Sequence, residues 1–210
     1  MKLHTCDPAP NPRRVNLFLA VKGIRIPTVQ VDLRAGEHLG EAFRRLNPRC
    51  IVPVLELDDG SVLCDGLAIC WYLESLYPDP PLLGRDALQT ARILSWEQMS
   101  FTDGFMPAAD ILRNRSQAFR DRAVTGPAAS AQIPALVERG RERLHQFWRY
   151  LETHLDGRRF IVGDSLTFAD INTLVIIDFA GWSKESVPAE CPKVLQWMQR
   201  IRELLPPEQR

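Results

Sequence analysis

Asp65-Gly66 places polar chemistry at the start of a helix predicted over residues 67–77. The unpaired N–H groups and the positive dipole end of a helix N-terminus suit a carboxylate, and the Asp65 carboxylate suits an ammonium group. A small ligand that carries both groups would find a partner for each. The alternative is that Asp65 is an ordinary N-cap of the helix.

Val52-Pro53 is the second stretch with binding chemistry, because it places a proline in a strand predicted over residues 52–57. If this peptide bond is cis, the N–H and C=O of Val52 are left unpaired at a strand edge. A peptide-like ligand could pair with that backbone as a short added strand. The alternative is an ordinary strand bent by proline.

Asn11 is the polar side chain next to the first predicted helix, over residues 13–22. Its amide can donate a hydrogen bond, whereas Ala9, two residues earlier, cannot. Asparagine is also among the best N-cap residues, so a structural role, alone or beside a chemical one, stays open. Arg13 and Arg14 could hold an anionic ligand or lie in solvent.

The cysteines are odd in number and scattered, without a CxxC pair: Cys6, Cys50, Cys64, Cys70 and Cys191. This usage fits a reducing cytoplasm better than a disulfide framework. We expect Cys6 to be an inert packing residue, and Cys50 is better placed for redox chemistry, with only Arg49 nearby to activate it. The 4 histidines form no cluster with metal-ligand spacing, so no metal site is expected.

Composition and charge exclude several classes of protein. The 210 residues allow one large or two small domains, and 26 Lys and Arg balance 26 Asp and Glu, so no basic excess argues for nucleic acid. No stretch approaches the roughly 20 apolar residues of a membrane-spanning helix, and the N-terminus lacks the apolar core of a signal peptide. We therefore expect a cytoplasmic protein with neither a nucleic-acid nor a membrane partner.

Strands and helices alternate in the first 75 residues. We predict strands over 2–6, 27–33, 52–57 and 61–64, and helices over 13–22, 41–46 and 67–77. The first strand-helix-strand unit can close with parallel strands, while the turn at Asp59-Gly60 makes the last two strands antiparallel. This order predicts a mixed four-stranded sheet with helices on both faces.

Pro78-Asp79-Pro80-Pro81 breaks this pattern, since proline prevents a helix from continuing and stiffens a linker. We predict a βα domain over residues 1–78, a linker over 79–85 and an all-helical domain over 86–210. Helical periodicity covers residues 86–115, bent near Gly104 and Pro107, and then 133–155 and 192–205. Residues 166–171 have the sequence of a capping box with its hydrophobic staple, which we interpret as purely structural.

Four stretches together resemble the cytosolic glutathione transferases: Pro8 to Val15, Asn47 to Leu55, Leu63 to Ile69 and Gly163 to Asp170. The resemblance spans nearly the whole chain in order and spacing. It implies a thioredoxin-like domain followed by an all-helical one, glutathione as co-substrate and a two-fold homodimer. The Val52-Pro53 backbone would then bind the cysteinyl part of glutathione, and Asp65-Gly66 the glutamyl end.

Three residues depart from the family pattern. The hydroxyl or thiol that stabilises the glutathione thiolate falls at Ala9, so we expect Asn11 to take over as catalytic residue. Ile51 lies at the glycyl carboxylate, where members often carry Lys or Gln, and Gly66 stands where serine is usual. Each lost contact would cost on the order of 1 kcal/mol of binding.

A second substrate would lie in an apolar cleft between the domains, lined by Trp96, Phe101, Phe105, Met106 and Trp182, unless these side chains are core. By resemblance, Asp103 would reach across the dimer to the glutamyl amine.

These expectations describe a detoxifying enzyme that activates the glutathione thiol for attack on a small hydrophobic electrophile. One alternative is a glutathione-dependent reductase of disulfides or peroxides. The other is a non-catalytic binding protein of the same fold, in which Ala9, Ile51 and Gly66 mark a dismantled site.

Overall fold

The computed structural model describes residues 1–7 and 9–206, and it divides the chain into two units. The first unit holds residues 1–80 together with 124–128, and the second holds 81–123 and the chain from residue 129 onward. Nothing in the sequence pattern indicates that residues 124–128 group with the first unit. Pro8 and residues 207–210, which fall in the predicted active-site loop and helical domain, lie outside the described residues.

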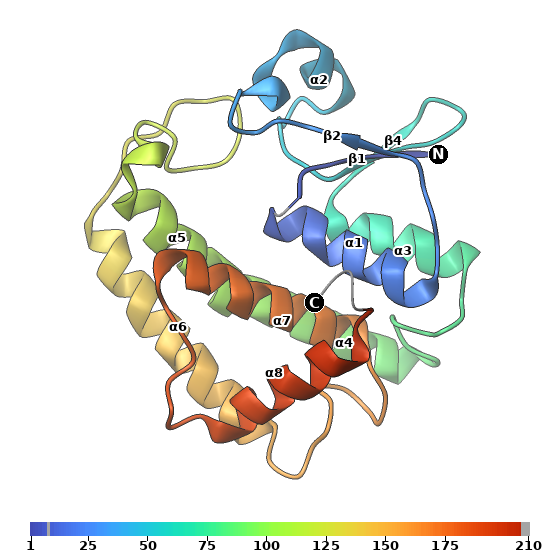
Figure 1. The fold of residues 1–210 in the computed structure, drawn as a ribbon, viewed down its shortest axis with the longest axis vertical. Coiled ribbons are helices and arrows are strands. Elements are labelled where there is room, and N and C mark those ends of the chain that lie inside the picture. Colours follow the sequence, from blue (N-terminus) through green and yellow to red (C-terminus); the bar gives the residue numbers. More distant parts are fainter. Residues whose placement is uncertain (8, 207–210) are drawn as a thin grey trace. The chain divides into compact units, whose positions relative to one another are not determined.

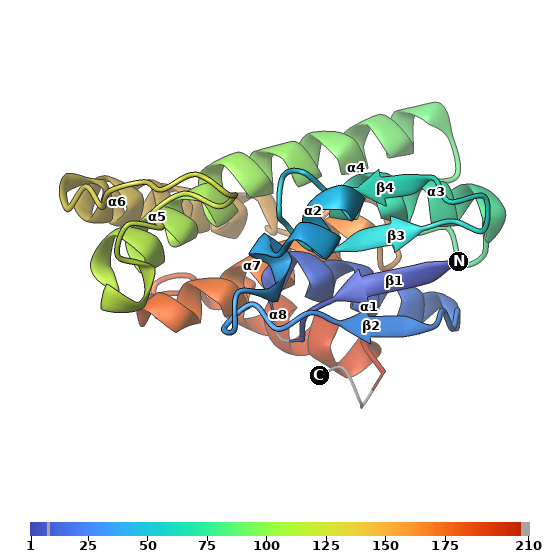
Figure 2. The same ribbon diagram turned by 90° about the horizontal axis from the view of Figure 1, so that it is seen from above.

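A four-stranded mixed sheet organises the first unit (Figure 2). Its strands are β1 (Lys2–Thr5), β2 (Thr28–Gln30), β3 (Val54–Glu56) and β4 (Val62–Cys64). Their order is β2-β1-β3-β4, with β1 parallel to β2 and antiparallel to β3, and β3 antiparallel to β4. This is the mixed sheet that the element order predicts, so the thioredoxin-like fold class is confirmed.

Three helices cover the two faces of this sheet. They are α1 (Pro10–Lys22), α2 (Glu41–Leu46) and α3 (Gly66–Leu76), with a 3-10 turn at Glu37–Leu39. Figure 1 shows α1 and α3 side by side on one face and α2 on the other. Gly23 ends α1 with a φ of 67°, the left-handed conformation that glycine adopts without a steric penalty.

The first unit differs from its sequence prediction at β2. The predicted strand over 27–33 has only three residues, all of them exposed, and Val29 is 37% exposed. β2 is an edge strand, so only one of its sides is paired. Val31, just beyond it, is buried in a cluster with Phe43, Val52 and Val54. The alternation of apolar and polar residues over 27–33 therefore reflects the burial of Val31 beyond the strand and not a longer strand.

The last residue of α1, Lys22, has a fully buried side chain. Its Nζ lies 2.8 Å from Glu74 Oε2 on α3 and donates to the carbonyl oxygens of Tyr77 and Pro80, both at 2.7 Å. The ammonium group thus donates two hydrogen bonds to main-chain carbonyls and forms an ion pair with the Glu74 carboxylate. Lys22 thus ties the end of α1 to the end of α3 and to the chain that follows it.

Lys22→Met should lower the free energy of unfolding by about 3 kcal/mol, because it removes a buried ion pair with Glu74 and the donor to two main-chain carbonyls. Lys2→Met is the matched control, since Lys2 is exposed and 3.5 Å from Glu56 and should change stability by less than about 1 kcal/mol. Urea unfolding followed by circular dichroism measures both. Equal effects of the two substitutions would contradict the role given to Lys22.

The second unit is built from helices: α4 (Ala87–Ser100), α5 (Met106–Arg115), α6 (Ala135–His154), α7 (Phe168–Ala180) and α8 (Pro192–Leu204). Short 3-10 turns lie at Gln117–Phe119 and Gly181–Ser183. The predicted long helix over 86–115 is divided by a π-helical segment, Phe101–Phe105, close to the expected bend. A Cβ at Gly104 would lie 2.8 Å from Ile176 Cγ2, so glycine lets this segment approach α7 closely.

The capping box at the start of α7 is present. Thr167 is the N-cap, and the Asp170 carboxylate accepts from the Thr167 main-chain N–H and hydroxyl, both at 3.0 Å. The other Asp170 oxygen accepts from Ile161 N at 2.9 Å and Trp197 Nε1 at 3.0 Å. Asp170 therefore joins α7, α8 and the preceding turn as well as capping its own helix.

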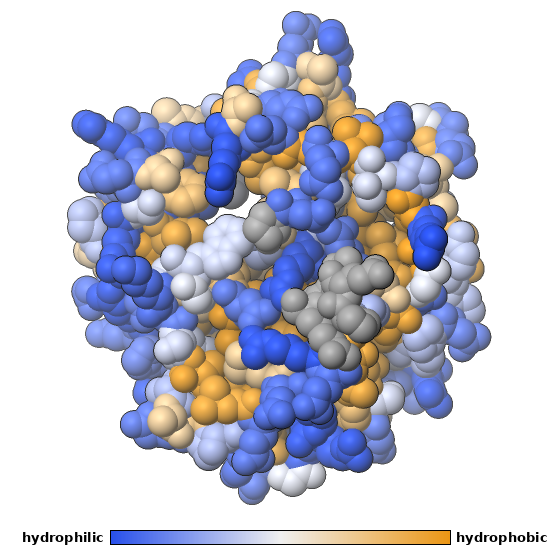
Figure 3. All heavy atoms as spheres, viewed as in Figure 1, coloured by the Kyte–Doolittle hydropathy of each residue, from blue (hydrophilic) through white to orange (hydrophobic). Residues whose placement is uncertain are grey.

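The surface view in Figure 3 shows apolar residues in patches among polar ones. This is usual for a folded protein, whose polar side chains cannot cover the whole surface. Within residues 1–7 and 9–206, none of the helices combines the length and apolar character needed to cross a bilayer.

Candidate functional site

Asp7 holds the loop that leads into α1. Its two carboxylate oxygens accept from Asn16 Nδ2 at 2.6 Å and from Gln30 Nε2 at 2.9 Å, and its main-chain N–H donates to Gln30 Oε1 at 3.2 Å. These bonds attach the loop to α1 and to β2. The role of Asp7 is not evident from the sequence, because nothing in its spacing indicates either partner.

The first turn of α1 offers few hydrogen-bond donors. Pro10 and Pro12 have no N–H, and the N–H of Arg13 donates to Ala9 O at 2.9 Å. The Ala9 N–H donates to Cys6 O at 2.8 Å. No described residue accepts a hydrogen bond from the Asn11 N–H, so this residue carries the available donors at the helix N-terminus.

The Asn11 side chain lies inside the helix rather than at its N-cap, which is Ala9. The alternative explanation of Asn11 as an N-cap residue is therefore wrong. Its Oδ1 atom is buried and meets no hydrogen-bond donor among the described residues. An unpaired buried polar atom typically costs about 1–3 kcal/mol, and functional sites are one place where such atoms occur.

Asn11 and Gly66 lie side by side because α1 and α3 pack together at their N-terminal ends (Figure 1). A Cβ at Gly66 would lie 3.3 Å from Arg14 Nη2 and 3.6 Å from the Asn11 carbonyl oxygen. A larger residue at position 66 would have to displace the Arg14 guanidinium slightly. Arg14 is only 3% exposed, so the alternative that its side chain lies in solvent is wrong.

Asp65 is the N-cap of α3 and accepts a hydrogen bond from Leu67 N at 2.9 Å. Its φ of 156° and ψ of 135° form a backbone conformation that residues with a Cβ rarely adopt, and such conformations cost about 1–3 kcal/mol. The residue is nevertheless exposed. The capping role is therefore present, and the carboxylate can still meet a cation from solvent.

The Val52-Pro53 peptide bond is cis. No described residue makes a hydrogen bond to the Val52 main-chain N–H or C=O, which leaves both groups open to a peptide-like ligand. The preceding turn is shaped by Asn47, which is 1% exposed. Asn47 Nδ2 donates to Ile51 O at 2.8 Å and its Oδ1 accepts from Arg49 N at 3.1 Å, a positioning role that no local sequence pattern indicates.

All five cysteines are free thiols, and Cys50, Cys70 and Cys191 are buried. Cys6 and Cys64 pack against the cluster around Val52 and Val54. Burial raises the pKa of the Cys64 thiol, and the charge of Arg49 opposes this shift only in part. Cys50 is 1% exposed, which argues against the redox role left open for it.

Asp103 belongs to the π-helical segment of the second unit. Its Oδ1 lies 3.0 Å from Arg143 Nη2 on α6. The carboxylate is half-buried and already paired within its own unit, so a bond to a ligand on another subunit would have to compete with Arg143.

The aromatic side chains predicted to line the second-substrate cleft fall into two groups. Phe101, Phe105, Phe179 and Trp182 form an aromatic row, with neighbouring ring centroids 5.0, 5.1 and 5.5 Å apart. Phe179 was not among the predicted residues, and Trp182 ends the row 49% exposed. Trp96 instead contacts His154 and Tyr150.

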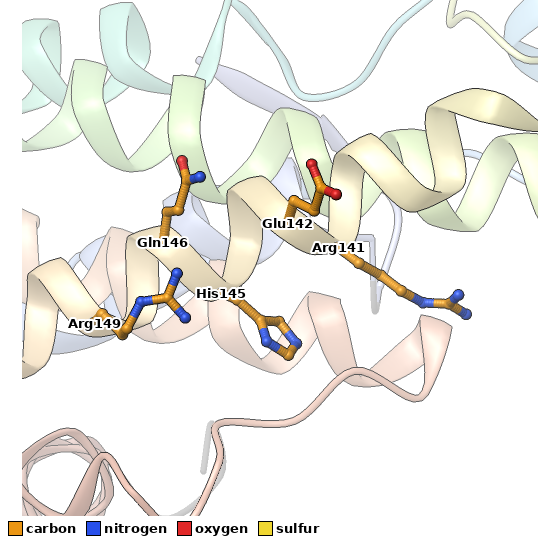
Figure 4. A pocket seen from close by; sticks show the side chains of 5 residues that line it. All are labelled: Arg141, Glu142, His145, Gln146 and Arg149. Carbon is orange, nitrogen blue, oxygen red and sulfur yellow. The ribbon is translucent and has the colours of Figure 1, made fainter.

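A shallow hollow of about 330 Å³ follows α6 and is lined by Arg141, Glu142, His145, Gln146 and Arg149 (Figure 4). Four-residue spacing puts Arg141, His145 and Arg149 along one side of the helix. Arg141 is already bonded to Glu138 and Glu185. The hollow contains none of the predicted site residues.

Two protein-family models match the chain: the glutathione S-transferase N-terminal domain over residues 9–76 and the glutathione S-transferase C-terminal domain over residues 136–205. Glutathione S-transferase 2 of Saccharomyces cerevisiae is 28% identical over 208 residues, which cover 97% of this chain and 86% of the relative. FtsZ-localized protein A of Caulobacter vibrioides is 31% identical over 191 residues, covering 85% and 78%.

A solved structure of a glutathione S-transferase domain-containing protein from Marinobacter aquaeolei has a TM-score of 0.84 and 31% sequence identity to this chain. The match covers 96% of this chain and 97% of that one. The matches thus extend over both units and agree with the four stretches that carry the resemblance in sequence. The chain belongs to the cytosolic glutathione transferase superfamily.

Proposed function

We propose that this protein is a glutathione transferase that binds glutathione on its first unit and activates the thiol at Asn11. The juxtaposition of Asn11 with the start of α3 carries the proposal. It gathers a hydrogen-bond donor, a helix N-terminus and an exposed carboxylate, supplied by elements far apart in sequence.

The glutamyl end of glutathione would bind at Asp65 and Gly66. Its ammonium group pairs with the exposed Asp65 carboxylate, and its carboxylate receives N–H donors from the first turn of α3. The cysteinyl part pairs with the free N–H and C=O of Val52. Ile51 has no charge to offer the glycyl carboxylate, so that end contributes less.

Asn11 would then stabilise the thiolate. When the thiol releases its proton to solvent, the sulfur anion accepts hydrogen bonds from the Asn11 N–H and side-chain amide. These bonds favour the anion over the neutral thiol and lower the thiol pKa. The thiolate attacks the electrophilic carbon of a small apolar substrate, a C–S bond forms, and the electron pair leaves with the displaced group.

Calorimetric titration with glutathione tests the proposed site through Asp65→Asn. Asparagine caps helices as well as aspartate does, so the variant keeps the fold and loses only the charge. Loss of a charged hydrogen bond worth about 2 kcal/mol should weaken glutathione binding about thirtyfold. Asp59→Asn, in the turn before β4, is the control and should bind as wild type does. Absence of glutathione binding in the wild-type protein would overturn the proposal.

Two observations favour the alternative of a non-catalytic binding protein. The first turn of α1 has few hydrogen-bond donors, and one similar relative is named FtsZ-localized protein A. A thiolate band in the ultraviolet difference spectrum of bound glutathione supports catalysis, and its absence supports a binding protein. Turnover of glutathione mixed disulfides with little conjugation would indicate the reductase.

We also propose that the protein is a cytoplasmic two-fold dimer in which Asp103 contacts the amine of glutathione bound to the partner subunit. Light scattering measures the assembly. Asp103→Asn would weaken glutathione binding if that contact forms.

A further inference from the structure

A second cavity lies wholly within the helical unit and includes none of the proposed glutathione-site residues. Its volume is about 290 Å³, and it is lined by Arg92 and Trp96 of α4, His154 at the end of α6, and Arg158, Ile161 and Val162 of the following turn. Two stretches of the chain that are distant in sequence, α4 and the end of α6 with its following turn, therefore build its wall. This size is at the lower end of small-molecule sites in proteins.

Two guanidinium groups give the cavity its charge. Among the described residues, no carboxylate pairs with the side chain of either Arg92 or Arg158. Two acidic residues that precede Arg158 in sequence are already engaged, since Asp156 pairs with Lys193 at 2.9 Å and Glu152 accepts from the main chain of α8. Two unneutralised cations on one cavity favour an anionic ligand.

His154 contributes shape rather than charge. Its Nε2 lies 2.8 Å from the Ile161 carbonyl oxygen, which can only accept, so Nε2 carries the ring proton. Burial lowers the pKa of His154; the hydrogen bond to the Ile161 carbonyl opposes this shift, and the positive charge of Arg158 adds to it, so a charged imidazolium is disfavoured. The imidazole is fixed against the indole of Trp96, with ring centroids 4.2 Å apart.

The rest of the lining is apolar and held in place. Trp96, Ile161 and Val162 are each less than a tenth exposed. The Ile161 N–H is bonded to the buried Asp170 carboxylate, which attaches the turn to α7. Gly163 has a φ of 72°, and a Cβ there would lie 2.9 Å from Gln89 Nε2, so the turn is closed against α4. A cavity formed by such a supported turn is preorganised for a ligand.

We propose that this cavity binds a small organic carboxylate with an apolar body. The carboxylate would lie between Arg92 and Arg158, whose planar guanidinium groups match its geometry. The apolar body would cover Trp96, Ile161 and Val162. The protein then has a ligand site separate from the one that holds glutathione.

Calorimetric titration of the full chain with 1-naphthoate tests this site. The double variant Arg92→Gln/Arg158→Gln should bind the probe at least about tenfold more weakly than wild type, because both charged hydrogen bonds are lost. Arg25→Gln/Arg120→Gln is the matched control. It removes two other exposed arginines and the same total charge, and it should leave the affinity unchanged. Saturating glutathione should not displace the probe.

The neutral analogue 1-naphthylmethanol separates charge from apolar contact, and it should bind at least about tenfold more weakly than the carboxylate. Equal binding of 1-naphthoate to the two double variants would overturn the proposal. Absence of 1-naphthoate binding to wild type, displacement by glutathione, or equal affinity for the neutral analogue would overturn it as well. Because Arg92 and Arg158 are exposed, their substitution leaves the fold intact and these outcomes are readable.

Discussion

Asp170→Asn should lower the free energy of unfolding by about 4 kcal/mol, because two buried donors each lose an acceptor worth about 1–3 kcal/mol. The Asp170 carboxylate is fully buried and accepts four hydrogen bonds. An asparagine amide has one acceptor oxygen, and its NH₂ group would face two of the same donors. Either orientation of the amide therefore leaves N–H or O–H groups pointing at each other.

Urea unfolding followed by circular dichroism measures this effect. Asp156→Asn is the matched control, since Asp156 is 75% exposed in its pair with Lys193 and contributes less than about 1 kcal/mol. If both variants unfold at the same urea concentration, Asp170 does not hold α7, α8 and the turn together.

The stability difference between wild type and Asp170→Asn should also depend on pH. Burial raises the pKa of Asp170, with its hydrogen bonds opposing the shift. Between the unfolded-state pKa and this raised value, the folded protein binds more protons than the unfolded chain. The stability contributed by Asp170 should therefore fall as pH rises through that window. The difference in unfolding free energy between wild type and Asp170→Asn should shrink as pH rises there, and no change would contradict it.

Asn11→Ala should raise the pKa of enzyme-bound glutathione by about one unit and lower kcat/KM about tenfold. The substitution removes the side-chain donor but keeps the main-chain N–H of residue 11, which donates to no other described residue. Asn11→Asp should have a larger effect, about a hundredfold, because it replaces the donor with a negative charge beside the thiolate. Asn11→Ser keeps a short donor and should recover part of the loss.

Ultraviolet difference titration of the bound thiol measures its pKa directly, and initial rates with a chromogenic electrophile give kcat/KM. Calorimetric binding of glutathione to each variant separates lost affinity from lost thiolate stabilisation. An unchanged thiol pKa in Asn11→Ala would show that the Asn11 side chain is not the donor.

Local signals in the sequence predicted most elements of this fold. Gly23 ends α1, Asp59-Gly60 turns β3 into β4, and Thr167 with Asp170 caps α7. Each signal acts between residues a few positions apart, so one sequence suffices to read it. The end points of elements were less accurate: α1 begins at Pro10 rather than Arg13, because prolines are accepted in the first turn of a helix.

The sequence by itself also located Asp65, Val52-Pro53 and Asn11 as candidate binding residues, since helix starts and strand-edge prolines can be recognised locally. Only the tertiary structure decided that Asn11 lies against Gly66 and that the Arg14 side chain is buried there. Asp7, Asn47 and Phe179 acquired their roles in the same way. These contacts join residues that are distant in sequence, and their geometry follows from how α1, α3 and the other elements pack, which no local pattern encodes.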